Sequence, residues 1–253
     1  MFGHRVTEWS NDVNTLSKHR SLIRYARLAG LMYLSIIVIY MAGLLLGESL
    51  RSESLTETVG NITDSEMLYR ASLTLMLLGS VFTIPLAGAL YIFLKRVDPN
   101  LALFALLWRT CEAALGAVAK TALFARLGVY TGGADAFDIN GQIALSGLFG
   151  SAYLASFNSG IVFFCGGSIL FFYLLLKSRF IPRRLAGFGL AASVWTLVVA
   201  LTSLIAPDLP TGAWWTPIFV AEIGTGLWLL IKGINLDYWQ RLPADSQQRG
   251  SVA

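Results

Sequence analysis

Charged side chains are scarce in this sequence. They make up 13% of its 253 residues, whereas a soluble globular domain carries about 25%. Apolar residues make up 55% and stand in long runs, and the mean hydropathy is +0.63. This composition excludes an ordinary soluble domain and indicates an integral membrane protein.

Metal ligands and activated nucleophiles are also scarce. The two histidines, His4 and His19, lie in the N-terminal tail, and the two cysteines, Cys111 and Cys165, fall within apolar runs. The sequence contains no His/Cys cluster with metal-ligand spacing, no Ser/His triad in the apolar runs and no glycine-rich nucleotide loop. We therefore expect no metal site and no cofactor, and the sequence assigns no catalytic residue.

Six apolar runs are long enough to cross a bilayer, whose hydrocarbon core of about 30 Å needs about 20 helical residues. The predicted spans are 28–47, 68–94, 101–123, 157–176, 185–205 and 214–231. The sequence thus predicts an all-α fold, a polytopic membrane helix bundle with six transmembrane helices. The connections between the runs are short, which indicates one membrane domain.

The fourth apolar stretch, 143–176, is too long for one upright span. Phe157-Asn158-Ser159-Gly160 interrupts its apolar pattern, so we expect a short outer helix over 143–155 followed by a separate span. Asn158 and Ser159 would then cap that span, and Asn158 is a secondary candidate for lining the outer mouth of a site.

The net charge is +4, and the basic residues stand at the ends of the apolar runs. This placement indicates that they set the membrane topology and do not form a nucleic-acid-binding patch. If the N-terminus is cytoplasmic, fourteen of the nineteen lysines and arginines lie on the cytoplasmic side. They are Arg5, Lys18, Arg20, Arg24, Arg27, Lys95, Arg96, Lys177, Arg179, Arg183, Arg184, Lys232, Arg241 and Arg249. The outer loops collect acidic residues, including Asp135 and Asp208. Both termini are therefore predicted to be cytoplasmic.

The chain divides into three segments by composition. Residues 1–26 form a basic cytoplasmic N-terminal segment, 27–235 the six-helix transmembrane domain, and 236–253 a polar C-terminal tail that we expect to be frayed.

A reporter that is active only in the periplasm tests this topology. We expect it to be silent when fused after Asp98 or at the C-terminus, and active when fused after Glu57 or Asp208, because these positions lie on opposite sides of the membrane. Activity of the C-terminal fusion would require an odd number of spans and would contradict the six-helix topology.

The third span carries a polar stripe. Arg109, Glu112, Gly116 and Lys120 share one helix face. Counted from Leu101, Arg109 lies about 12 Å deep, Glu112 about 16 Å and Lys120 about 28 Å. A charge at the bilayer centre costs roughly 2.5–3.5 kcal/mol on insertion scales, so the stripe must face other helices or a cavity. Lys120 is deep enough to reach the outer interface and is better explained as an anchor there.

The sixth span brings a second acid to the depth of Glu112. Glu222 lies about 12 Å from the outer end of its helix, and Thr225, one turn away, is placed to hydrogen-bond to it. We therefore predict a polar centre of Arg109, Glu112 and Glu222, with Lys120, Asn158 and Thr225 as secondary candidates. Full ionisation of the three would leave one net negative charge, which favours one protonated carboxyl.

Access to this centre is predicted from the outer face. The polar stripe continues outward through Gly116, whereas Ala105 and Ala102 lie on the cytoplasmic side of Arg109 on the same face. A cavity that is wet from outside would lower the free-energy cost of burying the charges.

Short stretches spread along the chain resemble one protein family. They are Arg27-Leu28-Ala29-Gly30-Leu31-Met32-Tyr33, Arg109 with Glu112-Ala113-Ala114, Ser178-Arg179-Phe180-Ile181-Pro182-Arg183, and Glu222 leading to Leu227-Trp228-Leu229-Leu230-Ile231-Lys232-Gly233. From about residue 27 to 235 the chain resembles a bacterial integral membrane protein family catalogued as domain of unknown function 4386. The resemblance implies a six-helix protein of a bacterial inner membrane and no established activity. The family's charged positions match Arg109, Glu112 and Glu222.

Three hypotheses for function remain open at this point. The first is a protein that binds or transports a small polar or amphiphilic molecule, or a proton, at the polar centre. The second is an intramembrane enzyme that acts on a lipid or isoprenoid, with a carboxyl as general acid. The third is a structural or accessory membrane protein, in which Arg109 only ties two helices together. The expected partners are membrane lipids and a small-molecule or lipid ligand, with no nucleic acid; the sequence does not indicate an oligomeric state.

Overall fold

The computed structural model describes residues 2–132, 137–206 and 212–241, and for residues 2–18, 212 and 241 it describes the backbone alone. Asp135, Asp208 and Arg249 of the charge analysis lie outside these residues. The helices are α1 (Phe2–Glu48), α2 (Leu55–Asp64), α3 (Glu66–Leu94), α4 (Pro99–Tyr130), α5 (Ile139–Ser178), α6 (Arg183–Ile205), η1 (Gly212–Trp215), α7 (Thr216–Ile231) and α8 (Leu236–Arg241). The described ranges contain no strand, and the all-α prediction is confirmed.

Six of these helices are long and apolar enough to cross a membrane. They comprise His19–Glu48 of α1, then α3, α4, α5 and α6, and finally Ala213–Ile231, which includes α7. The six predicted spans are therefore confirmed as helices, and most of them extend further than the apolar runs alone indicated. Which end of each helix faces the cytoplasm remains a prediction.

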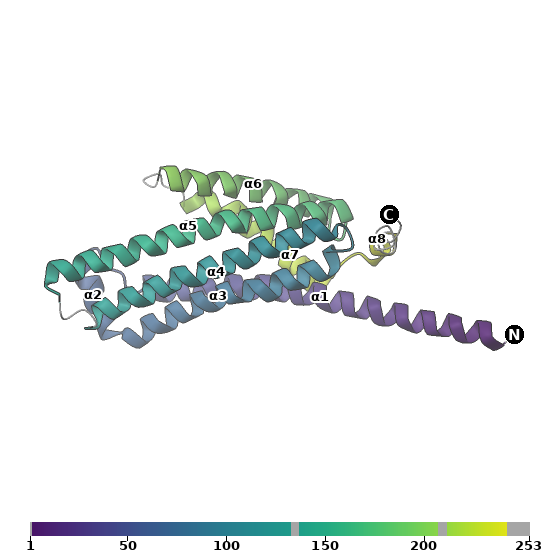
Figure 1. Ribbon diagram of the computed structural model, residues 1–253, viewed down its shortest axis with the longest axis horizontal. Helices are drawn as coiled ribbons and strands as arrows, with labels where there is room; N and C mark the ends of the chain where they lie inside the picture. The colour runs from purple at the N-terminus through teal and green to yellow at the C-terminus, as the bar shows by residue number, and fades with distance from the viewer. Residues whose placement is uncertain (1, 133–136, 207–211, 242–253) are drawn as a thin grey trace, which may run out of the picture.

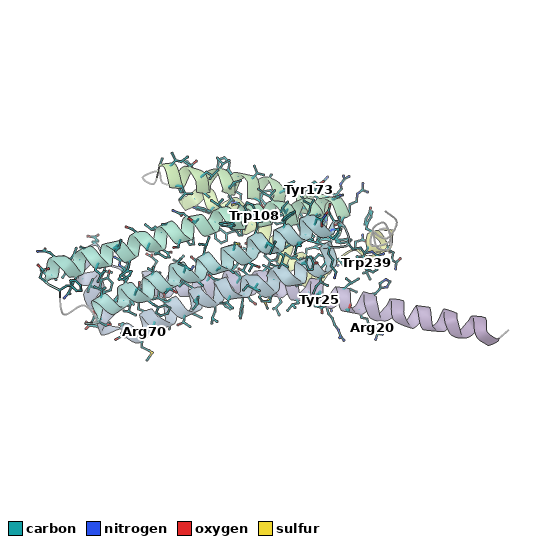
Figure 2. All side chains as sticks on the ribbon, viewed as in Figure 1. Arg20, Tyr25, Arg70, Trp108, Tyr173 and Trp239 are labelled. Carbon is teal, nitrogen blue, oxygen red and sulfur yellow. The ribbon has the colours of Figure 1, made fainter. Side chains whose placement is uncertain are left out.

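The six long helices form a ring in chain order. Each packs on the next, and α7 packs back on α1 to close the ring. Figure 1 shows an elongated bundle, with α2 at one end and α8 near the other, where the start of α1 projects beyond the bundle. Arg70 lies at the α2 end, whereas Arg20 and Trp239 lie at the α8 end (Figure 2). A ring of this kind encloses a space that residues from several helices can line.

The seam between α1 and α7 closes the ring through glycines. A Cβ atom on Gly30 would overlap the backbone of α7 at Leu230 N and lie 2.6 Å from Gly226 O. A Cβ atom on Gly226 would lie 3.0 Å from the Cβ of Tyr33. Small residues let two helix backbones approach closely, so these two glycines set how near α7 comes to α1.

The predicted break in the fourth apolar stretch is wrong, because α5 is one continuous helix of 40 residues. Its N-cap is Asp138, whose side chain accepts a hydrogen bond from Gly141 N. Asn158 and Ser159 lie inside the helix and do not cap it. At about 1.5 Å per residue, α5 is about 60 Å long, and it extends beyond the end of α6 (Figure 1). The excess length is accommodated because α5 packs along α4, which is itself 32 residues long.

Helices extend beyond both boundaries of the predicted transmembrane domain within the described residues. The boundary placed at residue 27 falls inside α1, which is continuous from Phe2 to Glu48. Leu236–Arg241 form α8 where a frayed tail was expected, because Trp239 is 5% exposed and packs edge-on against His19, with Arg96 3.8 Å from the centre of its indole ring. Residues 242–253 lie outside the described residues.

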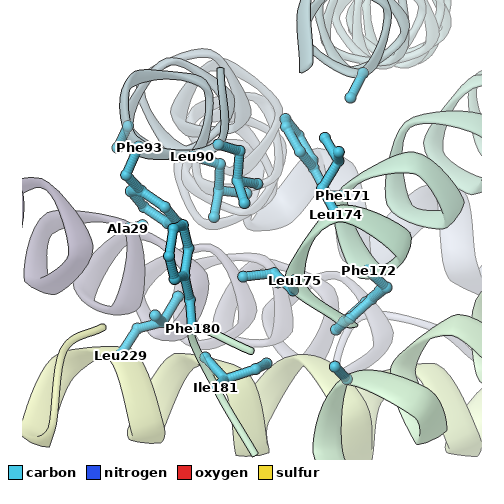
Figure 3. Packing of buried hydrophobic residues seen from close by; sticks show 14 of the residues in the cluster. Ala29, Leu90, Phe93, Phe171, Phe172, Leu174, Leu175, Phe180, Ile181 and Leu229 are labelled. Atoms are coloured by element: carbon cyan, nitrogen blue, oxygen red, sulfur yellow. The ribbon is translucent and has the colours of Figure 1, made fainter. Parts of the chain in front are cut away.

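An apolar core fills the α8 end of the ring. Phe93, Phe171, Leu175, Phe180 and Leu229 come from α3, α5, the α5–α6 connection and α7, and each is at most 1% exposed (Figure 3). The core continues to Ala102 and Ala105 of α4, both fully buried. It extends to Phe164 and Ile218 beside the polar stripe.

Candidate functional site

Arg109 of α4 lies at the centre of the polar cluster and is 4% exposed. Its Nε is 3.0 Å from Glu112 Oε2, and its Nη1 is 4.0 Å from Glu222 Oε1 on α7. Nη1 also donates a hydrogen bond of 3.2 Å to Ser168 Oγ on α5, and Cζ lies 4.7 Å from the centre of the Phe164 ring. The structure thus brings the three residues of the predicted centre together.

Two glycines of α5 create the space for this arginine. A Cβ atom on Gly167 would lie 2.7 Å from Arg109 Cγ and 3.2 Å from Ala105 O, and one on Gly166 would overlap the ring of Trp108. Trp108 lies about midway along the length of the bundle (Figure 2), on its exposed surface. The Gly166-Gly167 pair therefore lets α5 approach α4 closely enough for Ser168 to receive the guanidinium.

The two carboxylates are only partly satisfied. Within the described part of the chain, Glu112 Oε2 and Glu222 Oε1 are buried atoms without a hydrogen-bond partner. Both are within ion-pair distance of Arg109, but Glu222 at 4.0 Å is too far for a hydrogen bond. A buried carboxylate oxygen that accepts no hydrogen bond carries a desolvation penalty, so both atoms are ready acceptors for a donor that enters the site.

A cavity of about 170 Å³ lies directly against these carboxylates. Its walls come from α1, α3, α4, α5 and the η1–α7 segment, and three isoleucines and three phenylalanines supply much of the apolar lining. The polar side chains that line it include Tyr40, Ser80, Thr83, Glu112, Lys120 and Glu222. We call this the central cavity. The combination of apolar walls and a few convergent polar groups is typical of small-molecule sites.

Lys120 belongs to the central cavity and does not reach the surface. It is 2% exposed, and its Nζ lies 5.2 Å from the centre of the Tyr40 ring and 5.5 Å from that of Phe157. The sequence argument placed it at the outer interface by depth alone, but α1 and α5 continue past that depth and cover it. The centre was counted as three charged groups. Lys120 lines the same cavity as Glu112 and Glu222, and together with Arg109, which is paired with both carboxylates, the set has four charged groups and a formal charge of zero when all are ionised.

The other two secondary candidates do not act as predicted. Thr225 is fully buried, but among the described residues its Oγ1 has no hydrogen-bond partner, so it does not bond Glu222. Asn158 is half-buried in α5 and does not line the central cavity, whereas its neighbours Phe157 and Gly160 do.

A second cavity, of about 400 Å³, lies between the central cavity and the α2 end of the bundle. Leu44, Leu123 and Tyr153 line it, each about one helical turn beyond a residue that lines the central cavity. A side-chain hydrogen bond joins Tyr153 to Tyr40 of the central cavity. The two cavities are therefore arranged in series, whereas the apolar core fills the opposite end.

Several residues of the site were not identified from the sequence. Ser168 and Phe164 could not be selected, because the register of α5 against α4 is not readable from apolar periodicity. The Gly166-Gly167 pair was the available signal for a close approach there. In the described residues, no group of three or more His, Cys, Asp or Glu side chains is placed to hold a metal ion.

Six long apolar helices that enclose an ion-paired centre define a polytopic α-helical membrane protein. The chain belongs to the family described as Domain of unknown function (DUF4386), whose profile matches residues 28–233. The match includes all six spans and every residue of the predicted centre. Comparisons with curated proteins and with solved structures gave no match.

Proposed function

We propose that this protein binds, and through its paired cavities transports, a small amphiphilic molecule whose polar head donates hydrogen bonds. The head would occupy the central cavity against Glu112 and Glu222, and the apolar part would lie against the isoleucine and phenylalanine walls. The observation that carries the proposal is the pair of buried carboxylate oxygens without hydrogen-bond partners beside an apolar-walled cavity.

Local charge favours a cationic head. Arg109, Glu112 and Glu222 together carry one net negative charge when ionised, and the guanidinium is already directed at Glu112 and Ser168. An ammonium group placed between the carboxylates would donate to Glu112 Oε2 and Glu222 Oε1, which accept no hydrogen bond from the protein. Charge-assisted hydrogen bonds of this kind are shorter and roughly twice as strong as neutral ones.

The size of the cavity limits the ligand. A cavity of about 150 Å³ is known to hold a molecule of benzene size, so 170 Å³ admits a head and a short chain and excludes a whole phospholipid. The rest of a longer molecule would have to extend toward the second cavity.

The proposed setting is the inner membrane of a bacterium, with both termini in the cytoplasm. In that orientation the apolar core around Phe93 and Phe171 lies on the cytoplasmic side, and the two cavities open the path toward the periplasmic side. The basic residues at the α8 end, such as Arg20 in Figure 2, support this orientation.

Thermal unfolding in an uncharged maltoside detergent tests the proposed head group. Hexylamine at ten times its Kd should stabilise the protein by about 1.4 kcal/mol and raise Tm by roughly 3–5 °C. Hexanoate, with the same chain length and the opposite charge, should give a much smaller shift, because it would face two carboxylates.

A matched pair of glutamate variants locates the effect. Glu222→Gln should abolish the hexylamine shift, since it removes one of the two carboxylates to which the ammonium would donate. Glu48→Gln, at an exposed glutamate that lines only the second cavity, should retain it. An equal shift with hexanoate, or an unchanged hexylamine shift in Glu222→Gln, would contradict the proposal.

A further inference from the structure

We propose that Lys120 binds the acidic end of the ligand, so that the ligand class of the central cavity is a small zwitterion with a separated amine and carboxylate. This inference rests on the proposed function, because it takes the amine to lie at Glu112 and Glu222. It adds a second polar subsite at the other end of the same cavity.

Lys120 is a buried ammonium group that makes no salt bridge within the described residues; Glu112, in the same cavity, acts on it only at longer range. The residue is only 2% exposed, and it lines the central cavity. Among the described residues its Nζ has no hydrogen-bond acceptor and no ion-pair partner; its contacts are the faces of Tyr40 and Phe157. Cation–π contacts offset only part of the free energy of hydration that a buried ammonium loses.

Charge balance then selects a zwitterion. Glu112, Glu222 and Lys120 line the cavity, and Arg109 is paired with the two glutamates from behind them, so these four charged groups sum to zero when all are ionised. A simple amine would leave the whole cavity with one excess positive charge, and a simple carboxylate with one excess negative charge. A molecule with both groups satisfies the free carboxylate oxygens and the free ammonium without adding net charge to a low-dielectric region.

The positions of the two subsites require separation of the charged groups. Glu112 and Lys120 are eight residues apart on α4, so their Cα atoms are about 12 Å apart along the helix axis, and the charged ends are somewhat closer because the lysine side chain leans toward the start of the helix. An α-amino acid, whose ammonium and carboxylate are adjacent, cannot reach both ends. An ω-amino acid with an apolar chain can, and its chain would lie along the isoleucine and phenylalanine walls.

Calorimetric titration of the whole protein in maltoside detergent tests the inference with three six-carbon probes. We expect 6-aminohexanoate to bind with a Kd at least tenfold lower than that of hexylamine, and hexanoate to bind more weakly than either. The shorter 4-aminobutanoate should lose most of this advantage, because it cannot span the two subsites.

Variants of Lys120 separate this subsite from the carboxylate end. Lys120→Met should raise the Kd of 6-aminohexanoate to that of hexylamine, and Lys120→Arg should keep most of the difference. Lys232→Met, at an exposed lysine at the end of α7, is the matched control and should change nothing. If Lys120→Met does not fold, the comparison of 6-aminohexanoate with hexylamine in the unaltered protein still tests the inference.

The outcomes distinguish the two proposals. If 6-aminohexanoate binds no better than hexylamine while hexylamine still binds, the zwitterion inference is overturned and the amine site remains. If neither compound binds, the proposed function itself fails. A tenfold preference that persists in Lys120→Met would also overturn the role of Lys120.

Discussion

Replacing Arg109 with methionine is expected to lower the free energy of unfolding by about 3–5 kcal/mol, because it leaves two buried carboxylates without their cation. Methionine has a similar length, so the cavity left by the guanidinium is small. The arginine also receives support from Ser168 and the Phe164 ring, and both contacts are lost with it. Unfolding by sodium dodecyl sulfate in mixed micelles measures the change.

A compensating variant identifies the cause of that loss. Arg109→Met combined with Glu112→Gln and Glu222→Gln removes all three charges, and we expect it to recover more than half of the lost stability, since replacing a whole buried ion cluster is often nearly neutral. If the triple variant is no more stable than Arg109→Met alone, packing rather than charge holds the centre together. In that case the ion-pair account of the site is wrong.

The second large effect is expected at the seam between α1 and α7. Gly30→Ala should lower the free energy of unfolding by about 1–3 kcal/mol, because the new methyl group meets the backbone at Leu230 N and Gly226 O. Backbone atoms cannot rotate aside as a side chain can, so α7 must move away from α1. Since Glu222 is on α7, the same change should weaken hexylamine binding.

Gly187→Ala is the control for the seam. A Cβ atom on Gly187 of α6 meets no atom within 4 Å, so this change should be neutral or stabilise the helix by up to about 1 kcal/mol. Equal behaviour of the two alanine variants would mean that α1 and α7 are not in close contact in the folded protein.

The transmembrane helices and the charged centre were predictable because each rests on a local rule. Apolar runs of 20 or so residues define spans by length, and the fixed rise of a helix puts Arg109 and Glu222 at a common depth. The helical period places Glu112 and Lys120 on one face. None of these steps needs knowledge of how the helices pack.

The remaining features depend on packing between helices. Lys120 was assigned to the interface because depth alone ignores the neighbouring helices; Tyr40 of α1 and Phe157 of α5 cover it. A break was predicted at Asn158 because polar residues and glycine interrupt the apolar run there. The helix continues through this interruption because α5 packs along α4. The hydrogen bond from Arg109 to Ser168 depends on the α4–α5 register, which apolar periodicity leaves undetermined.

The most direct test of a ligand-binding central cavity is the reactivity of a cysteine placed in it. In a protein with Cys111 and Cys165 replaced, Ser80→Cys adds a thiol of nearly the same shape to the cavity wall, and Ser193→Cys adds one at a fully buried serine of α6 outside that wall. We predict that 2-aminoethyl methanethiosulfonate modifies Ser80→Cys, that hexylamine and 6-aminohexanoate protect it, and that Ser193→Cys does not react. Equal reactivity of the two cysteines, or modification of Ser80→Cys that neither compound slows, would contradict the account.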